Sequence, residues 1–262
     1  MSRSAAGPGA VAADLRDAAA ARAAITEAAP EVVYHLAALA HVGRSWADPA
    51  TTLADNQAIV LNVLEGVRAE APEAVLVAVS SGEVYGRPAT LPVDESAPLR
   101  PQNPYAVSKA ASDLLAGFYA DAHGLRVARP RAFNHAGPGQ PAIYALASFT
   151  RQVAAGLESG ADPIQIVTGN PDARRDFTDV RDVVRAYRLL AATGEPGAFN
   201  VCSGRSASPR ELLAALEDAA GVRIEHAVVD GANHFFDGKV DELMASVDEY
   251  LTKRLGKSEK AA

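Results

Sequence analysis

A tyrosine and a lysine stand four positions apart in the segment Tyr105-Ala-Val-Ser-Lys109. Residues at positions i and i+4 lie one above the other on a helix face. The lysine ammonium would stabilise the phenolate of Tyr105 and lower the pKa of that tyrosine towards neutral pH. Ser81, at the end of a predicted strand, supplies a hydroxyl that can polarise a substrate oxygen. The three residues therefore predict an acid–base site that moves a proton while a cofactor moves the hydride.

The elements that must position these residues alternate between strand and helix. Apolar, valine-rich runs predict buried strands at 31–38, 74–81 and 125–133, with helices between them at about 51–70 and 105–123. Later segments predict a strand at 163–168, a helix at 180–192, a strand at 198–202 and a helix at 209–220. This alternation predicts an α/β fold with a parallel sheet that carries helices on both faces.

Composition narrows the class of protein. The net charge of -7 and the pI of about 5.4 argue against a nucleic-acid-binding protein, which would show a basic stripe. No apolar run approaches the length of a membrane span, and the first residues lack the apolar core of a signal peptide. The one cysteine, Cys202, excludes an intramolecular disulfide, and we expect it to be buried in a strand. A cytoplasmic location fits these features.

The six histidines are scattered along the chain, and none has a metal-ligand spacing to another histidine or to the cysteine. They are His35, His41, His123, His135, His226 and His234. We therefore expect no metal site.

Six segments together resemble one family, the extended short-chain dehydrogenases/reductases of the NAD-dependent epimerase/dehydratase type, whose substrates are nucleotide-linked sugars. The segments are His35-Leu-Ala-Ala38, Ser80-Ser-Gly-Glu-Val-Tyr-Gly86, Tyr105-x-x-x-Lys109, Arg131-Ala-Phe-Asn134, Arg174-Arg-Asp-Phe-Thr-Asp179 and Phe199-Asn-Val-Cys-Ser-Gly204. A Tyr-x-x-x-Lys motif alone is weak evidence, whereas six segments in the family's order are strong evidence. The resemblance runs from about residue 14 to about residue 224.

The resemblance implies a role for each matching residue. Ser81, Glu83, Tyr105 and Lys109 would be catalytic, with Tyr105 as the proton donor or acceptor and Lys109 also on the nicotinamide ribose. Glu83 is typical of the dehydratases and 4-keto-sugar reductases, where many epimerases carry a hydroxyl or small residue.

The same resemblance implies two binding sets. The cofactor, NAD or NADP, would contact Asp14, Leu15, Leu36, Ala37, Ala38 and Phe133 in addition to Tyr105 and Lys109. The substrate would contact Asn134 and Arg175, because the planar guanidinium of an arginine binds phosphate oxygens bidentately.

The implied activity is oxidation or reduction at a sugar carbon of a nucleotide-linked hexose. The segment from Arg131 to Gln140 most resembles GDP-4-keto-6-deoxymannose reductases and their dehydratase relatives. A sugar-nucleotide epimerase is the second interpretation, and a non-catalytic relic is a third. The family also implies a homodimer through the helices at 51–70 and 105–123.

Both ends of the chain depart from the family pattern. The sequence contains no G-x-x-G-x-x-G turn, so we expect a Rossmann-like sheet that lacks its first β-α-β unit. The predicted domains are an incomplete NAD(P)-binding domain over 1–140, a substrate lobe over 141–226 whose strand near 198–202 returns to the sheet, and a tail over 227–262. The tail resembles the end of an α/β-hydrolase with an amphipathic helix and includes His234. A hydrolase is nevertheless disfavoured, because the chain has no G-x-S-x-G nucleophile elbow.

Overall fold

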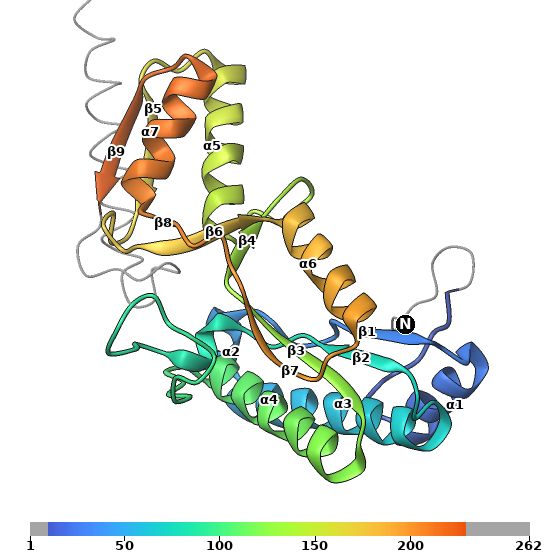
Figure 1. The fold of residues 1–262 in the computed structure, drawn as a ribbon. Coiled ribbons are helices and arrows are strands. Elements are labelled where there is room, and N and C mark those ends of the chain that lie inside the picture. The colour runs from blue at the N-terminus through green and yellow to red at the C-terminus, as the bar shows by residue number, and fades with distance from the viewer. Residues whose placement is uncertain (1–9, 229–262) are drawn as a thin grey trace, which may run out of the picture. The chain divides into compact units, whose positions relative to one another are not determined.

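The computed structural model describes residues 10–228 of the chain. It divides into two compact units, shown in Figure 1. Among the described residues, the first comprises 10–135 and 178–204, and the second comprises 136–177 and 205–228.

A parallel sheet forms the centre of the first unit. Its strands are β1 (Val32–His35), β2 (Val75–Ala78), β3 (Arg126–Ala132) and β7 (Gly197–Val201), in the order β1-β2-β3-β7. Every neighbouring pair is parallel. The predicted α/β fold with a Rossmann-like parallel sheet is therefore confirmed. Since the strands are parallel, their carboxyl ends meet at one edge, where ligands of such sheets bind.

Helices cover both faces of this sheet (Figure 1). They are α1 (Ala18–Ala28), α2 (Val42–Ala47), α3 (Pro49–Glu70), α4 (Pro104–His123) and α6 (Val180–Thr193), with the short 3-10 helix η1 (Gly82–Tyr85) after β2. Leu76 packs in one core cluster with residues of α1, α3 and α4, and Val77 packs in another with residues of α6. Successive strand side chains point to opposite faces, so these two adjacent residues anchor one helical layer each.

Local sequence sets the ends of α4, the helix that carries Tyr105 and Lys109. The Asn103 side chain caps its start by accepting from the backbone N–H of Ala106 at 2.7 Å, and Pro104 occupies the first turn. Gly124 ends the helix with a left-handed backbone at a φ of 69°. The prediction of this helix is therefore confirmed to within one residue.

The second unit has its own small core. It contains α5 (Ala145–Ser159), β5 (Ile164–Thr168), β6 (Arg175–Asp179), β8 (Ser206–Ala207), α7 (Pro209–Ala220) and β9 (Ile224–Val228), while β4 (Asn134–Ala136) and β6 each extend across a boundary with the first unit. β5 pairs with β9 in parallel, and β6 pairs with β8 in antiparallel orientation. Phe149, Val153, Ile166 and Leu213 form the buried cluster.

Three expectations need correction. The strand near 198–202 returns to the sheet as expected, as β7, but α6 also belongs to the first unit and not to the lobe over 141–226, because its Val183 and Tyr187 pack on the main sheet. Cys202 is exposed rather than buried, because β7 ends at Val201. The second strand ends at Ala78, so Ser81 lies three residues beyond it.

The hydrolase-like tail, apart from its first two residues, and His234 lie outside the described residues. Within the described part of the chain, no helix is both long and apolar enough to span a membrane.

Candidate active site

Ser81 occupies a turn at the carboxyl edge of the main sheet. It is buried and caps η1, where its Oγ accepts a hydrogen bond from the backbone N–H of Glu83 at 3.2 Å. The oxygen acts as the acceptor in this bond, so the O–H can donate to a substrate oxygen. This geometry fits the polarising role predicted for Ser81.

Glu83 links this turn to the start of α4. Its Oε2 accepts from the Nδ2 of Asn103 at 3.1 Å, and Asn103 is the residue that caps α4. The turn with Ser81 and the helix with Tyr105 are therefore held together by one side-chain hydrogen bond, and the half-buried Glu83 carboxylate lies beside them.

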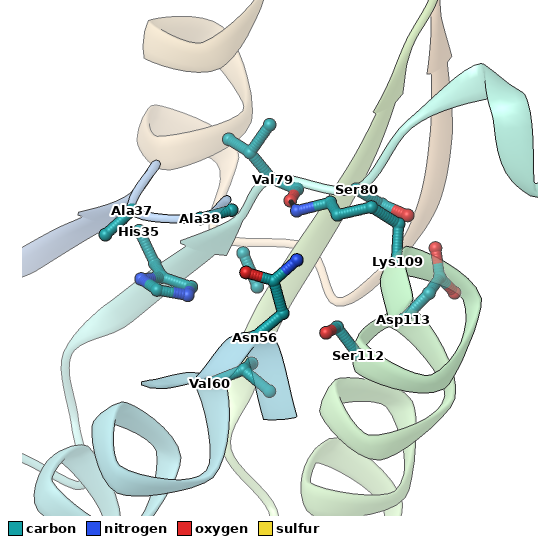
Figure 2. Close-up of a pocket in the computed structure, with 11 residues that line it drawn as sticks. His35, Ala37, Ala38, Asn56, Val60, Val79, Ser80, Lys109, Ser112 and Asp113 are labelled. Atoms are coloured by element: carbon teal, nitrogen blue, oxygen red, sulfur yellow. Dashed lines mark hydrogen bonds between the residues drawn. The ribbon is translucent and has the colours of Figure 1, made fainter. Parts of the chain in front are cut away.

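Tyr105 and Lys109 lie one turn apart on α4, with Tyr105 half-buried and Lys109 only 7% exposed. Lys109 donates to the backbone carbonyl of Val79, which joins β2 to the turn of Ser81 (Figure 2). Burial removes the ammonium from water and lowers the pKa of Lys109 to about 8, although the charge of Asp113 opposes this change. The structure thus brings Ser81, Glu83, Tyr105 and Lys109 to one edge of the first unit.

His35 lines a cavity next to Lys109, together with Asn56, Ser80 and Asp113 (Figure 2). The cavity measures about 10 Å³, which is space for about one water molecule. Burial and then the neighbouring Lys109 charge lower the pKa of His35 to about 4. His35 is therefore neutral at neutral pH, and Lys109 is the cation of this region.

The loop after β1 presents apolar residues at the same edge of the sheet. Leu36 is 62% exposed and Ala37 is exposed, whereas Ala38 is half-buried. Asn56 of α3 fixes the end of this loop: its Oδ1 accepts from the Leu39 N–H at 2.7 Å, and its Nδ2 donates to the Leu39 carbonyl at 3.2 Å. The loop therefore has a defined conformation although its apolar side chains face outward.

The same Asn56 amide also reaches α4, because its Nδ2 donates to the Ser108 Oγ at 2.9 Å. The sequence interpretation missed Asn56, since its partners lie 17 and 52 positions away along the chain. Spacing along one helix gives no signal for such contacts.

A buried ionic group was also missed. The Asp113 carboxylate accepts from Nε of Arg131 at 2.9 Å, from its Nη2 at 3.0 Å and from Nη1 of Arg129 at 3.0 Å. A signal for it exists in the sequence, because Asp113 follows Lys109 by four positions and so continues the face of Tyr105 and Lys109. Arg129 and Arg131 are two apart in β3, which places them on one face of the sheet.

Two cofactor-side residues of the prediction pack inside the first unit. The ring of Phe133 stacks with that of Tyr85 at a centroid distance of 6.4 Å. It also lies so near Gly82 that a Cβ there would approach the ring to 2.9 Å. Leu15 packs against the core cluster that Leu76 forms with residues of α1, α3 and α4. Asp14 accepts two hydrogen bonds from the Arg16 Nε at 3.0 and 3.1 Å.

The two predicted substrate residues are exposed. Asn134 begins β4, at the end of the first unit. Arg175 lies in the second unit, where its Nη1 donates to the Arg174 carbonyl at 2.8 Å. Asn134 thus belongs to the first unit and Arg175 to the second.

Comparisons with known proteins show which family the chain resembles. The sequence model of the GDP-mannose 4,6 dehydratase family matches residues 7–252. GDP-6-deoxy-D-mannose reductase of Pseudomonas aeruginosa is 41% identical over 199 residues, which cover 75% of this chain and 65% of that protein. UDP-glucose 4-epimerase of Mycolicibacterium smegmatis is 31% identical over 203 residues, which cover 75% of this chain and 62% of that protein.

A solved structure of RMD from Pseudomonas aeruginosa complexed with NADPH is also similar. It superposes with a TM-score of 0.78 at 36% identity, over 87% of this chain and 78% of that one. The chain spans less than two thirds of the length of the two curated relatives named above. The match to the family model nevertheless covers most of the chain, and the chain belongs to the NAD-dependent epimerase/dehydratase family of extended short-chain dehydrogenases/reductases.

Proposed function

We propose that the chain carries the catalytic residues of an NAD(P)-dependent enzyme that reduces or dehydrates a nucleotide-linked sugar, with a GDP-linked 4-keto-6-deoxyhexose as the first candidate substrate. The observation that carries the proposal is the buried Lys109 ammonium one turn from Tyr105, beside the turn of Ser81. The 41% identity to a GDP-6-deoxy-D-mannose reductase supports the choice of substrate.

Ser81, Tyr105 and Lys109 each have a different role at the substrate carbonyl. The Ser81 O–H donates to the substrate oxygen and polarises it. Tyr105 passes its proton to that oxygen as the carbonyl becomes a hydroxyl, and the positive charge of Lys109 stabilises the phenolate that remains. Lys109 is the only lysine before position 239 in the sequence, so no other lysine of the described residues can take this role.

A nicotinamide cofactor, when bound, supplies the hydride to the sugar carbon or accepts it from there. The residues at the carboxyl edge of the main sheet are chemically suited to bind the nicotinamide ring and its ribose. Leu36 and Ala37 offer an uncovered apolar surface, and the buried Lys109 and half-buried Tyr105 offer polar groups for the ribose hydroxyls. Phe133, close to Gly82, would meet the nicotinamide side.

The pyrophosphate of such a cofactor has no comparable site among residues 10–228. Backbone N–H groups of a glycine-rich turn normally bind it. The sequence contains no G-x-x-G-x-x-G, and no strand with such a turn precedes β1 in the described part. We therefore propose that the described residues contact mainly the nicotinamide half of the cofactor. Asp14 and Leu15 would be the adenine contacts.

The remaining site residues complete the proposal. Glu83, held by Asn103, would supply the second acid–base group that elimination of water requires. Asn134 and Arg175 would bind the sugar and its diphosphate, for which the exposed guanidinium of Arg175 is chemically suited.

A sugar-nucleotide 4-epimerase is the second candidate. Its support is the 31% identity to a UDP-glucose 4-epimerase. The same Tyr105 and Lys109 would serve both activities. A reductase consumes one reduced cofactor in each turnover, whereas an epimerase returns the hydride to its substrate and consumes none.

We further propose that the protein forms a homodimer through the outer faces of α3 and α4. These faces expose the apolar side chains of Leu61, Val107, Leu114 and Phe118. Exposed apolar side chains that gather on one surface mark an interaction site.

The test is an assay of the purified chain against three substrates. GDP-4-keto-6-deoxymannose with NADPH or NADH should give a fall in reduced-nicotinamide absorbance. Conversion of GDP-mannose to a keto sugar without net cofactor consumption would instead identify a dehydratase, and interconversion of UDP-glucose would identify an epimerase. No conversion of any of the three, with a cooperatively folded chain, would contradict the proposal.

A further inference from the structure

A carboxylate that the proposed chemistry does not use lies at the centre of the first unit. The Asp113 side chain has no exposed surface, and three hydrogen bonds from Arg129 and Arg131 hold it. Burial would raise the pKa of Asp113, but the hydrogen bonds and charges of these guanidinium groups outweigh burial, and its pKa lies below the ordinary value. Asp113 is therefore a fixed negative charge inside the protein.

One chain of hydrogen bonds connects the Asp113 carboxylate, through Arg131, to the turn of Ser81. The Nη1 of Arg131, on the same guanidinium that holds Asp113, donates to the Tyr85 Oη at 2.9 Å. Tyr85 is fully buried at the end of η1, and its hydroxyl donates to Oδ1 of Asn200 at 2.8 Å. The helix η1 that begins after Ser81 is thus attached through Arg131 to the carboxylate on α4.

The Asp113 carboxylate also acts electrostatically on Lys109, which lies on the same helix, α4. Residues four apart face the same side of a helix, and Figure 2 shows Asp113 one turn beyond Lys109 at the same cavity. The groups that face Lys109 from the other elements are the neutral His35 at the end of β1, the neutral amide of Asn56 on α3 and the Val79 carbonyl after β2. Asp113 is accordingly the only anion among the described residues that line this cavity.

We infer that Asp113 is a positioning residue of the active site, whose carboxylate keeps the Lys109 ammonium charged and, through Arg131 and Tyr85, holds the turn of Ser81 against α4. The catalytic meaning of this role rests on the function proposed above. Its electrostatic part is a property of the folded chain without substrate or cofactor.

The electrostatic part is measured by the titration of Lys109. The sequence has five lysines, and the other four lie at position 239 and beyond, so lysine labelled with ¹³C at Cε gives a simple spectrum. The variant Lys109→Met assigns the signal. In Asp113→Asn, the midpoint of the Lys109 titration should fall by about one pH unit or more, because a nearby opposite charge is lost.

A second variant should move the same midpoint in the opposite direction. Arg129→Gln removes one of the two cations that neutralise Asp113, so the Lys109 midpoint should rise by about half a pH unit. The exposed Asp121→Asn on the same helix is the matched control and should leave it unchanged.

These opposite shifts separate positioning from a merely structural role. A structural carboxylate would lower the melting temperature in both variants and leave the Lys109 midpoint at its wild-type pH, which would overturn the inference. If Asp113→Asn does not fold by near-UV circular dichroism, Arg129→Gln carries the test, since the Asp113–Arg131 pair remains. A midpoint that does not rise there would also overturn the inference.

The connection from Asp113 through Arg131 to Tyr85 is tested by Tyr85→Phe, which removes only the hydroxyl. We expect kcat to fall about 10-fold or more with a smaller change in KM, because a displaced Ser81 stabilises the transition state less well. The Lys109 midpoint should stay in place. An unchanged kcat would refute this connection.

Turnover also distinguishes the two proposals. In Asp113→Asn the alkaline fall in activity should move to lower pH by the same amount as the Lys109 midpoint. A wild-type chain without turnover would refute the proposed function, whereas the shifts of the Lys109 midpoint would still decide the electrostatic inference.

Discussion

The two faces of α4 depart from the usual distribution of side chains. Besides the apolar Ala116 and Tyr119, its inner face buries a polar set, while its outer face leaves Leu114 62% exposed and Phe118 57% exposed. The buried polar set is Ser108, Lys109, Ser112 and Asp113. A surface helix normally buries its apolar side and exposes its charges. The buried polar groups on the inner face fit the proposed active site, and the uncovered apolar groups on the outer face fit the proposed dimer contact.

The inner face is stable because its polar groups have partners. Lys109 donates to Val79, the Ser112 Oγ donates to the Ser108 carbonyl, and Asp113 is paired with two arginines. Buried polar groups are tolerated when they are hydrogen-bonded. The outer face has no equivalent requirement, because exposed apolar side chains leave no polar group unsatisfied.

The largest expected effect comes from the reacting group of the inner face. Tyr105→Phe should lower turnover of the GDP-linked keto sugar by about 1,000-fold, because general acid catalysis contributes about 10²–10⁴-fold. The melting temperature should stay near the wild-type value, since only a hydroxyl is removed. Tyr34→Phe, on an exposed tyrosine of β1, is the control and should keep full activity. Unchanged turnover in Tyr105→Phe would remove Tyr105 from the mechanism.

The second effect concerns the ionic group beneath this face. Arg131→Met leaves the buried Asp113 with one of its two partners and should lower the free energy of unfolding by about 3–5 kcal/mol. Urea denaturation measures this loss. Arg151→Met on exposed surface of α5 should change stability by no more than about 0.5 kcal/mol. A loss below about 1 kcal/mol for Arg131→Met would show that the group contributes little to folding.

The third effect is a pH dependence from His35. The folded pKa of about 4 lies below the ordinary 6.5, so the unfolded chain binds a proton between these values that the folded chain does not. Stability should therefore fall by up to about 3 kcal/mol as the pH drops from about 6.5 to about 4. His35→Gln should reduce that fall in urea denaturation series. Equal slopes in both proteins would contradict the buried neutral state of His35.

The smallest effect on stability is expected at the outer face. Phe118→Lys should alter the free energy of unfolding by no more than about 0.5 kcal/mol, because the side chain is exposed. The same variant should convert the proposed dimer to a monomer in analytical ultracentrifugation. Val184→Lys, at an exposed apolar position of α6, is the matched control and should leave the dimer intact. A wild-type monomer would refute the dimer directly.

Local patterns predicted the parts of the molecule that depend on neighbours in sequence. Valine-rich runs located the buried strands, and the spacing of Tyr105 and Lys109 located the inner face of α4. The capping residue Asn103 and Gly124 fixed the helix ends by local rules. Cys202 was misplaced, because the apolar run around it gave no sign that β7 ends one residue earlier.

Contacts between distant segments could not be predicted in this way. Asn56 meets Ser108 across 52 positions, and Asp113 meets Arg131 across 18. Such pairs arise only when the sheet and its helices have formed. The burial that lowers the pKa of Lys109 is likewise a property of the packed unit, and a Tyr-x-x-x-Lys spacing does not reveal it.

A deuterium-labelled cofactor would show whether the site containing Tyr105 transfers a hydride to the keto sugar. The chain is incubated with GDP-4-keto-6-deoxymannose and NADPH that carries deuterium on the transferable position of nicotinamide C4, and the product is analysed by mass spectrometry. We expect a reduced GDP-sugar that is heavier by about one mass unit, formed by the wild-type chain and not by Tyr105→Phe. The absence of the reduced sugar, or its formation without the label, would contradict the assignment of the inner face of α4 as a reductase site.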